Sequence, residues 1–361
     1  MSRGEARSRH ASGVSSSWAV TPLTELLGVR LPIVLSPMAG GPSTPALAAA
    51  VSDAGGLGSL AGAMLAPDEL RAAVRELRTL TDRPFAVNVF SPLPPPSGDR
   101  IAEWAALTGR PPQIPDPPRW SVEDQIAVIA GEGVRILSFT FGIPPLAAFP
   151  GVTIGTATTA AEAVALERAG VDVVVAQSFE AGGHRGSFLG EPERSLVGGL
   201  ALVPQVVDAV SVPVVAAGGI MDGRGIAAAL ALGAQGAQLG TAFIACDESG
   251  ATREHRDALG EETTITAVFT GRHARGIRTA AVDTLERSGV APPDYPLARS
   301  LFPDPVRLAG QGGPLARRLP AGELVRTLAA ETEAAIARLD QPAARNRNSP
   351  KPSVSRPPSS T

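Results

Sequence analysis

The sequence has 361 residues but only one cysteine, and its only lysine is Lys351. A single cysteine, Cys246, cannot form an intramolecular disulfide, which favours a reducing compartment, the cytoplasm. Lys351 lies in a Pro/Ser-rich stretch near the C-terminus, so the rest of the chain offers no amine nucleophile. Schiff-base chemistry is therefore disfavoured.

Several other signals are missing. No apolar run is long enough to span a bilayer, and the arginines of residues 1–17 are not followed by the apolar segment of a secretory signal. A net charge of −3 and a pI near 5.9 leave no basic excess, so neither nucleic acid nor an anionic membrane is an expected partner. No residues have metal-site spacing, and no Gly-x-Ser-x-Gly motif occurs. The expected partner is a small molecule, and the oligomeric state is left open.

What the sequence does contain is a regular alternation of short apolar runs and Ala/Leu-rich stretches. With 44% hydrophobic residues the chain can bury a large core. This alternation predicts a parallel sheet with crossover helices. Eight runs predict strands, at residues 33–38, 57–62, 85–90, 136–141, 153–157, 171–177, 212–217 and 237–243. We therefore expect an α/β fold of the (β/α)8 TIM-barrel type. Helix caps are predicted at Thr159, as a capping box with Glu162, and at Asp222.

The remaining segments define the predicted domain organisation. Residues 1–17 and 341–361 are rich in Ser, Arg and Pro and are expected to be disordered tails around one barrel domain, 18–340. The Pro-rich segment 91–120 follows the third strand and is either a cover over a ligand or a rigid surface insert. Residues 253–318 have no clean period and are expected to form an appended layer over the barrel mouth, followed by a final helix.

The turn at 177–187 carries the candidate catalytic group. It follows the sixth apolar run with Glu180, two adjacent glycines and His184. An imidazole with an unperturbed pKa near ~6.5 can exchange a proton around neutrality. Glu180 is expected to cap backbone amides rather than to orient His184. Arg185 is expected to point to solvent, with attraction of an anionic substrate as the alternative.

Glycines at two strand ends indicate the ligand class. The segments Val214-Val-Ala-Ala-Gly-Gly-Ile220 and Gly236-Ala-Gln-Leu-Gly-Thr-Ala242 offer backbone N–H groups for a phosphate. Pro37-Met-Ala-Gly40 offers apolar packing, and the amides of Asn88 and Gln177 suit the polar edge of a flavin, so FMN is the predicted ligand.

The other histidines receive weaker assignments. His10 and His255 are given no role. His273 lies between Arg272 and Arg275, a group expected to form surface ion pairs, with contact to a phosphate or an anionic substrate as the alternative.

At these residues the sequence resembles the nitronate monooxygenase family, formerly called 2-nitropropane dioxygenases. The matching motifs run in the family's order across roughly residues 20–340: Pro37-Met-Ala-Gly40, Phe85-Ala-Val-Asn-Val-Phe90, Ser138-Phe-Thr-Phe-Gly142, Ala176-Gln-Ser-Phe-Glu-Ala-Gly-Gly-His-Arg-Gly186, Ala216-Ala-Gly-Gly-Ile220, Gln238-Leu-Gly-Thr241 and Phe269-Thr-Gly-Arg272. Two positions depart from the family pattern. Ser178 stands where glycine is usual, and His273 where proline is usual.

The resemblance implies an FMN-binding barrel in which His184 is the catalytic base. It places the cofactor against Asn88, Gln177, Gly182, Gly219, Gln238, Leu239, Gly240 and Thr241. Met38 of the first motif and Gly218 of the seventh strand complete the predicted cofactor site.

The implied reaction is oxidation of an alkyl nitronate, for example propionate 3-nitronate, by O2 to a carbonyl compound and nitrite, without a nicotinamide. His184 would remove the α-proton of a neutral nitroalkane or hydrogen-bond the anionic substrate. Two alternatives stay open: an FMN-dependent NADH oxidoreductase acting on a quinone or an enoyl thioester, and a non-enzymatic flavin-binding barrel that regulates a partner. The physiological nitronate is not determined by the sequence.

Overall fold

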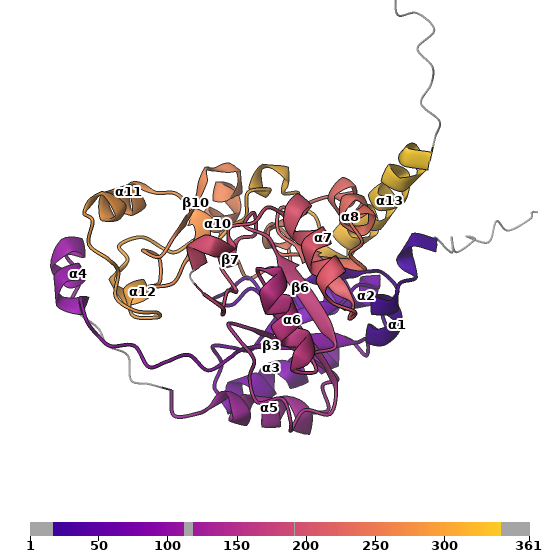
Figure 1. Ribbon diagram of the computed structural model, residues 1–361, viewed down its shortest axis with the longest axis horizontal. Helices are drawn as coiled ribbons and strands as arrows, with labels where there is room; N and C mark the ends of the chain where they lie inside the picture. The colour runs from indigo at the N-terminus through magenta and orange to yellow at the C-terminus, as the bar shows by residue number, and fades with distance from the viewer. Residues whose placement is uncertain (1–16, 112–117, 191, 341–361) are drawn as a thin grey trace, which may run out of the picture.

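The protein is a parallel β-barrel surrounded by helices, seen in a computed structural model that describes residues 17–111, 118–190 and 192–340 (Figure 1). Its eight-stranded sheet has the order β1-β9-β8-β6-β5-β4-β3-β2. A parallel bridge between Val34 of β1 and Leu57, the residue just before β2, connects the two ends of this order. The strands are β1 (Ile33–Leu35), β2 (Gly58–Ala61), β3 (Phe85–Phe90), β4 (Ile136–Thr140), β5 (Val152–Ala157), β6 (Val173–Gln177), β8 (Val214–Ala217) and β9 (Gly236–Leu239). The predicted TIM barrel is confirmed.

The outer ring of helices buries the outer surface of the barrel. α1 (Pro22–Leu27) lies at the N-terminal end of the strands, where Leu23 and Leu27 pack in one cluster with Val34, Ile136 and Val173. The members of the ring are α2 (Pro45–Ala54), α3 (Pro67–Leu80), α5 (Val122–Gly131), α6 (Ala160–Arg168), α7 (Gly199–Ala209), α8 (Gly223–Ala231) and α13 (Ala321–Asp340). The last of them, α13, packs on α8 and α2 and so ties the C-terminal end of the described chain to the start of the barrel. Since helices cover its outer face, the strands are apolar on both faces: Val173 and Val174 of β6 are both fully buried.

Local sequence signals account for the helix starts. Asp222 accepts hydrogen bonds from the amides of Arg224 and Gly225 and caps α8, as predicted. Thr159 caps α6, but the predicted capping box is wrong. The carboxylate of Glu162 bonds instead to the amide and hydroxyl of Thr158, which leaves the box incomplete.

The eighth strand is shorter than predicted. β9 ends at Leu239, and the run then turns at Gly240 into the short helix α9 (Thr241–Ile244). The prediction of strand up to residue 243 was wrong, because a short apolar run does not by itself distinguish strand from buried helix. The turn brings Thr241 to the mouth of the barrel.

A second layer lies over the C-terminal ends of the strands. It contains an antiparallel sheet of order β10-β11-β7, formed by β10 (Thr263–Thr266), β11 (Ala274–Ile277) and β7 (Gly183–His184). Around this sheet lie α10 (Arg253–Asp257), α11 (Ala280–Arg287) and α12 (Ala298–Leu301), with short 3-10 turns at Ser17–Ala19, Pro192–Ser195, Ala258–Gly260 and Gly313–Leu315 elsewhere in the chain. β7 belongs to the barrel connection after β6, so the layer and the barrel share the segment that contains His184.

The Pro-rich segment contributes a helix to this layer. α4 (Ile101–Thr108) packs against α12, and its Trp104 is fully buried in a cluster with Phe269 and Leu301. Figure 1 shows α4, α11 and α12 grouped at one end of the molecule, away from α1 and α13. The segment is therefore anchored to the appended layer; its residues 112–117 lie outside the described chain.

The predicted disordered tails also lie outside the described residues, apart from Ser17. Among the residues that are described, no helix combines the length and the apolar character needed to cross a membrane.

Candidate active site

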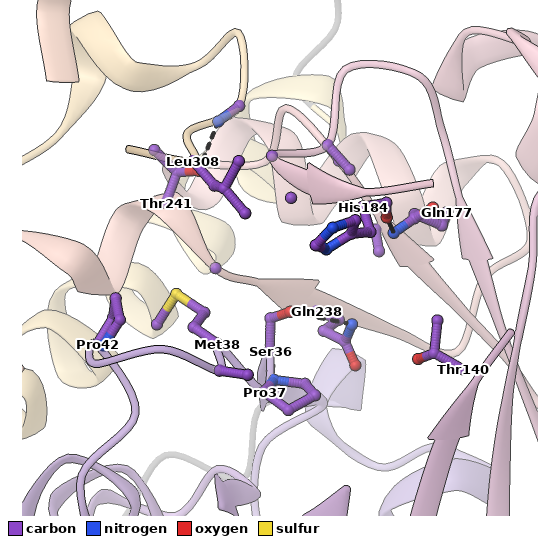
Figure 2. A pocket seen from close by; sticks show the side chains of 18 of the residues that line it. Ser36, Pro37, Met38, Pro42, Thr140, Gln177, His184, Gln238, Thr241 and Leu308 are labelled. Carbon is purple, nitrogen blue, oxygen red and sulfur yellow. Dashed lines mark hydrogen bonds between the residues drawn. The ribbon is translucent and has the colours of Figure 1, made fainter. Parts of the chain in front are cut away.

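A cavity opens at the C-terminal ends of the barrel strands, between the barrel and the appended layer. His184 and every predicted cofactor residue except Leu239 line it: Met38, Asn88, Gln177, Gly182, Gly218, Gly219, Gln238, Gly240 and Thr241. Figure 2 shows Thr241 beside Leu308, with His184 beside Gln177 and Met38 beside Ser36 and Pro37. The topology therefore brings together residues that are up to two hundred positions apart in the chain.

Leu239 has a different position. Its side chain is 1% exposed in the barrel core, and its backbone oxygen accepts a hydrogen bond of 2.9 Å from the amide of Ser36. It joins β9 to the end of β1, and its neighbours Gln238 and Gly240 line the cavity in its place.

Gly218 and Gly219 form a turn with unpaired backbone amides. Their φ angles are 111° and 70°, values that strongly favour glycine. Within the described residues, neither N–H donates a backbone hydrogen bond. Two amides at the end of a strand, facing a cavity, are suited to hold an anion.

Ser178, the residue that departs from the family pattern, lies behind this turn. It is fully buried, its hydroxyl has no hydrogen-bond partner among the described residues, and it does not line the cavity. A Cβ added at Gly218 would clash with that hydroxyl and would lie 2.9 Å from the amide nitrogen of Ala181. Ser178 therefore packs against the glycine turn.

The appended layer closes the cavity with a second run of glycines. The amide of Gly310 donates to the hydroxyl of Thr241 at 2.9 Å, and the amide of Gln311 donates to the backbone oxygen of Glu180 at 3.0 Å. A Cβ at Gly182 would lie 2.5 Å from the nitrogen of Gly310, so these two backbones require glycine. Sequence reasoning missed Gly310, although Gly310-Gln-Gly-Gly313 is a visible signal in a segment of no clear period.

The predicted amides differ in how much of their bonding capacity is used. Asn88 donates to the hydroxyl of Ser138 at 3.1 Å, and Gln238 donates to that of Ser36 at 3.4 Å. Gln177 is bonded at both ends: it donates to the backbone oxygen of His184 at 3.0 Å and accepts from Arg185 and the amide of Gly186. Asn88 and Gln238 thus retain free carbonyl groups within the described residues, whereas Gln177 holds together the turn at 177–187.

Arg185 is buried, and the prediction that it points to solvent was wrong. It is 1% exposed and donates to three backbone oxygens, those of Ser178 at 2.6 Å, Gln177 at 3.1 Å and Ser195 at 2.9 Å. Because successive side chains on a strand point to opposite faces, His184 faces the cavity and Arg185 the protein interior. Burial lowers the pKa of Arg185 to about 10, so it remains charged at neutral pH.

Glu180 caps a helix, as predicted. Both of its carboxylate oxygens lie 3.1 Å from the amide nitrogen of Gly199, at the start of α7. A carboxylate at a helix N-terminus is stabilised by the unpaired amides and the helix dipole.

His184 is held by a hydroxyl and by aromatic edges. Its Nε2 lies 2.9 Å from the hydroxyl of Thr270, and its ring meets those of Tyr295 and Phe141 edge-on at 5.3 and 5.9 Å. Burial first, and then the positive charges of Arg272 and Arg299, lower the pKa of His184 from 6.5 to about 3. The imidazole is therefore neutral at neutral pH and has a lone pair that can accept a proton.

Of the two arginines around His273, Arg275 is buried and Arg272 is half-buried, so the expected surface ion pairs of these arginines were wrong. Arg272 places its guanidinium 4.2 Å from the ring centre of Phe141 and donates to the backbone oxygen of Ser187. Arg275 is 4% exposed and donates to the backbone oxygen of Phe179 at 2.9 Å. The surface position was predicted from the charges alone, and the sequence did not indicate the hairpin of β10 and β11, which turns both side chains inward.

The sequence also missed parts of the cavity wall. Tyr295 and Arg299 line it from the appended layer, and His255, given no role, lines it with its Nε2 3.0 Å from the backbone oxygen of Leu308. Tyr295 is the only tyrosine of the chain and lies in the Pro-rich run Pro292-Pro-Asp-Tyr-Pro296, a local signal of an unusual position. The side chain of Arg299 forms no ion pair or hydrogen bond with the described residues, so its charge is available to a ligand.

Comparison with known proteins gives consistent matches over nearly the whole chain. The family model described as nitronate monooxygenase matches residues 21–341. A nitronate monooxygenase of Pseudomonas aeruginosa is 45% identical over 347 residues, which is 85% of this chain and 98% of the relative. A probable nitronate monooxygenase of Bacillus subtilis is 43% identical over 289 residues, covering 75% of this chain and 83% of the relative.

Two solved structures are similar throughout. A nitroalkane oxidase from Streptomyces ansochromogenes has a TM-score of 0.80 and 42% identity, covering 88% of this chain and 99% of its own. FabK from Thermotoga maritima has a TM-score of 0.69 and 30% identity, covering 89% of this chain and 98% of its own.

Proposed function

The chain belongs to the nitronate monooxygenase family, and on that premise we propose that it uses FMN and O2 to oxidise nitronates, such as propionate 3-nitronate, to carbonyl compounds and nitrite. The observation that carries the proposal is one cavity that combines unpaired glycine amides, a neutral histidine and an available arginine. These groups suit, in turn, the phosphate of a cofactor, the acidic proton of a substrate and a substrate anion.

The chemistry of the cavity fits FMN. The free amides of Gly218 and Gly219, close to Gly240 and Thr241 at the next strand end, would hold the phosphate. Asn88 and Gln238, together with Met38, would contact the ring system through amide and apolar groups. Bound FMN would supply the ability to accept electrons from the substrate and to pass them to O2.

His184 would then act at the reacting carbon. Because its imidazole is neutral, it can accept the α-proton of a nitroalkane, and the protonated ring can hydrogen-bond the nitronate that results. Arg299 would attract the anionic substrate, and it would favour one that carries a second negative charge. Tyr295 and Phe90 narrow the cavity with aromatic surface and exclude water from the site.

The test is to mix the purified protein without oxygen with propionate 3-nitronate, and separately with NADH, while recording the flavin spectrum. We expect FMN to copurify, the nitronate to change its spectrum, and air to release nitrite. If only NADH bleaches the flavin, the reductase alternative replaces this proposal. A flavin-containing protein that reacts with neither compound would support the regulatory alternative.

A further inference from the structure

The hairpin loop between β10 and β11 holds a threonine against the catalytic histidine. Residues 267–273 form this loop, and Thr270 within it is 0% exposed. The neighbouring Gly271 has φ 92°, and a Cβ there would lie 2.5 Å from the amide nitrogen of Tyr295. The loop is therefore fixed between His184 on one side and the Tyr295 segment on the other.

The Thr270 hydroxyl has three possible hydrogen-bond partners, of which one can only accept and one can only donate. Its oxygen lies 2.9 Å from Nε2 of His184, 3.2 Å from the backbone oxygen of Arg272 and 3.4 Å from the backbone nitrogen of Arg272. A hydroxyl has one hydrogen to donate and two lone pairs to accept with. A carbonyl oxygen can only accept, so the hydroxyl donates to Arg272 O and accepts from the amide of Arg272. All contacts are then satisfied when Nε2 of His184 carries a hydrogen and donates it to Thr270.

This arrangement decides which ring nitrogen faces the ligand. With hydrogen on Nε2, the neutral ring has its lone pair on Nδ1. Nδ1 forms no hydrogen bond with a described residue, and it is not among the buried atoms that lack a partner, so it is open to the cavity that His184 lines.

We propose that Thr270 is a positioning residue that holds His184 in the Nε2–H tautomer and so directs the Nδ1 lone pair at the α-proton of the substrate. The proposal rests on the proposed function of His184. In the step that it serves, the α-C–H bond of a neutral nitroalkane breaks and its electron pair forms the C=N bond of the nitronate, while the π electrons of one N=O bond move onto that oxygen, which takes the negative charge. The proton forms a new N–H bond at Nδ1. The charged or titratable groups that face the ring are Arg272, Arg299 and Tyr295.

Kinetics with two substrate forms can separate positioning from folding. Oxidation of a preformed nitronate needs no proton removal, whereas oxidation of the neutral nitroalkane does. We expect Thr270→Val to lower kcat/KM about tenfold or more for the neutral nitroalkane and by less than about threefold for its nitronate, because a general base contributes roughly a hundredfold or more. Thr270→Ser should restore both values. Thr284→Val, an exposed threonine on α11, is the matched control and should change neither.

Equal losses for the two substrate forms, or no rescue by serine, would overturn the proposal.

A second readout needs no turnover. Nitrogen NMR of the holoprotein with isotope-labelled histidine distinguishes the protonated from the unprotonated ring nitrogen, and the sequence has only four histidines to assign. With His184→Asn identifying the signal, we expect hydrogen on Nε2 in the wild-type protein and in Thr270→Ser, and a mixture of tautomers in Thr270→Val. Hydrogen on Nδ1 in the wild-type protein would refute the positioning role. If neither substrate form is oxidised, the proposed function fails, and the NMR result still decides the role of Thr270.

Discussion

Arg185 donates a hydrogen bond of 3.1 Å to the side-chain oxygen of Gln177, and Gln177 donates one of 3.0 Å to the backbone oxygen of His184. The end of β6 and strand β7 are thereby joined through one buried cation, the guanidinium of Arg185. The amide of the next residue, Gly186, also donates to the side-chain oxygen of Gln177, so the two ends of the turn at 177–187 are hydrogen-bonded to each other. The position of His184 therefore depends on a residue that points away from the cavity.

Replacing this cation should disturb both stability and the site. We expect Arg185→Met to lower the free energy of unfolding by about 3–5 kcal/mol, because three backbone oxygens lose a buried charged donor. The variant should also retain less flavin after purification. Urea denaturation and the flavin-to-protein ratio measure the two effects.

Arg253→Ala is the control for that change, since the side chain of Arg253 is 89% exposed and its ion pair with Asp257 lies on the surface. It should alter stability by less than about 1 kcal/mol. If Arg185→Met were as mild as this control, the buried network would not support the turn.

The glycine turn gives a second prediction. We expect Gly218→Ala to lower the flavin content and to destabilise the protein by about 1–3 kcal/mol, because alanine at φ 111° is strained and its Cβ meets Ser178. Adding Ser178→Gly should recover only part of the loss, since the amide of Ala181 still lies 2.9 Å from the new Cβ. Absorbance of released flavin and a thermal melt give the measurements.

For comparison, Gly131→Ala at the end of α5 meets nothing within 4 Å and should stay within about 1 kcal/mol of the wild type. Full recovery in the double variant would show that the hydroxyl of Ser178, and not the backbone, sets the requirement for glycine.

The barrel and the strand-end glycines could be predicted because their signals are local. Apolar runs separated by helical stretches define strands within a few residues of their true ends, as the exact bounds of β3 show. A glycine before a helix or at a strand end indicates that the backbone at that same position needs a conformation or a close contact that a side chain would prevent. The place of His184 at the cavity could be predicted for the same reason, since it lies in the turn after a β run and directly follows two glycines.

The remaining site residues could not be predicted because their roles depend on distant chain segments. Thr270 is 86 positions from His184, and the hydrogen bond that joins them exists only because β7 pairs with β11. Arg185 was misplaced because a long cation after a turn is ordinarily solvated, and nothing local shows the three carbonyl groups that surround it. The appended layer has no regular period, so the positions of Tyr295 and Arg299 at the cavity follow only from its packing.

The guanidinium of Arg299 at the cavity should make the enzyme prefer a nitronate that also carries a carboxylate. We expect Arg299→Met to raise KM for propionate 3-nitronate about tenfold or more, and to raise it less for an alkyl nitronate of similar length, because only the first has a carboxylate to pair with the guanidinium. Arg299→Lys should retain part of the preference, since it keeps the charge but not the forked geometry. Steady-state oxygen uptake with both substrates measures the ratio. The same increase for both nitronates would assign Arg299 to the nitronate group common to them.

His184 should make stability depend on pH in a defined window. Its pKa in the folded protein is about 3, whereas in the unfolded chain it is near ~6.5, so between these values the unfolded state binds a proton that the folded state does not. The free energy of unfolding must then fall as the pH is lowered through this window, and the contribution is fully present above pH ~6.5.

From pH 7 to pH 5 the wild-type protein should lose at most about 2 kcal/mol more than His184→Asn, which has no imidazole at this position. Other acids and His255 titrate in both proteins and cancel in the difference. Urea midpoints at the two pH values provide the comparison. Equal losses in both proteins would mean that the pKa of His184 in the folded cavity is close to its value in water, so that burial and the two arginines do not depress it.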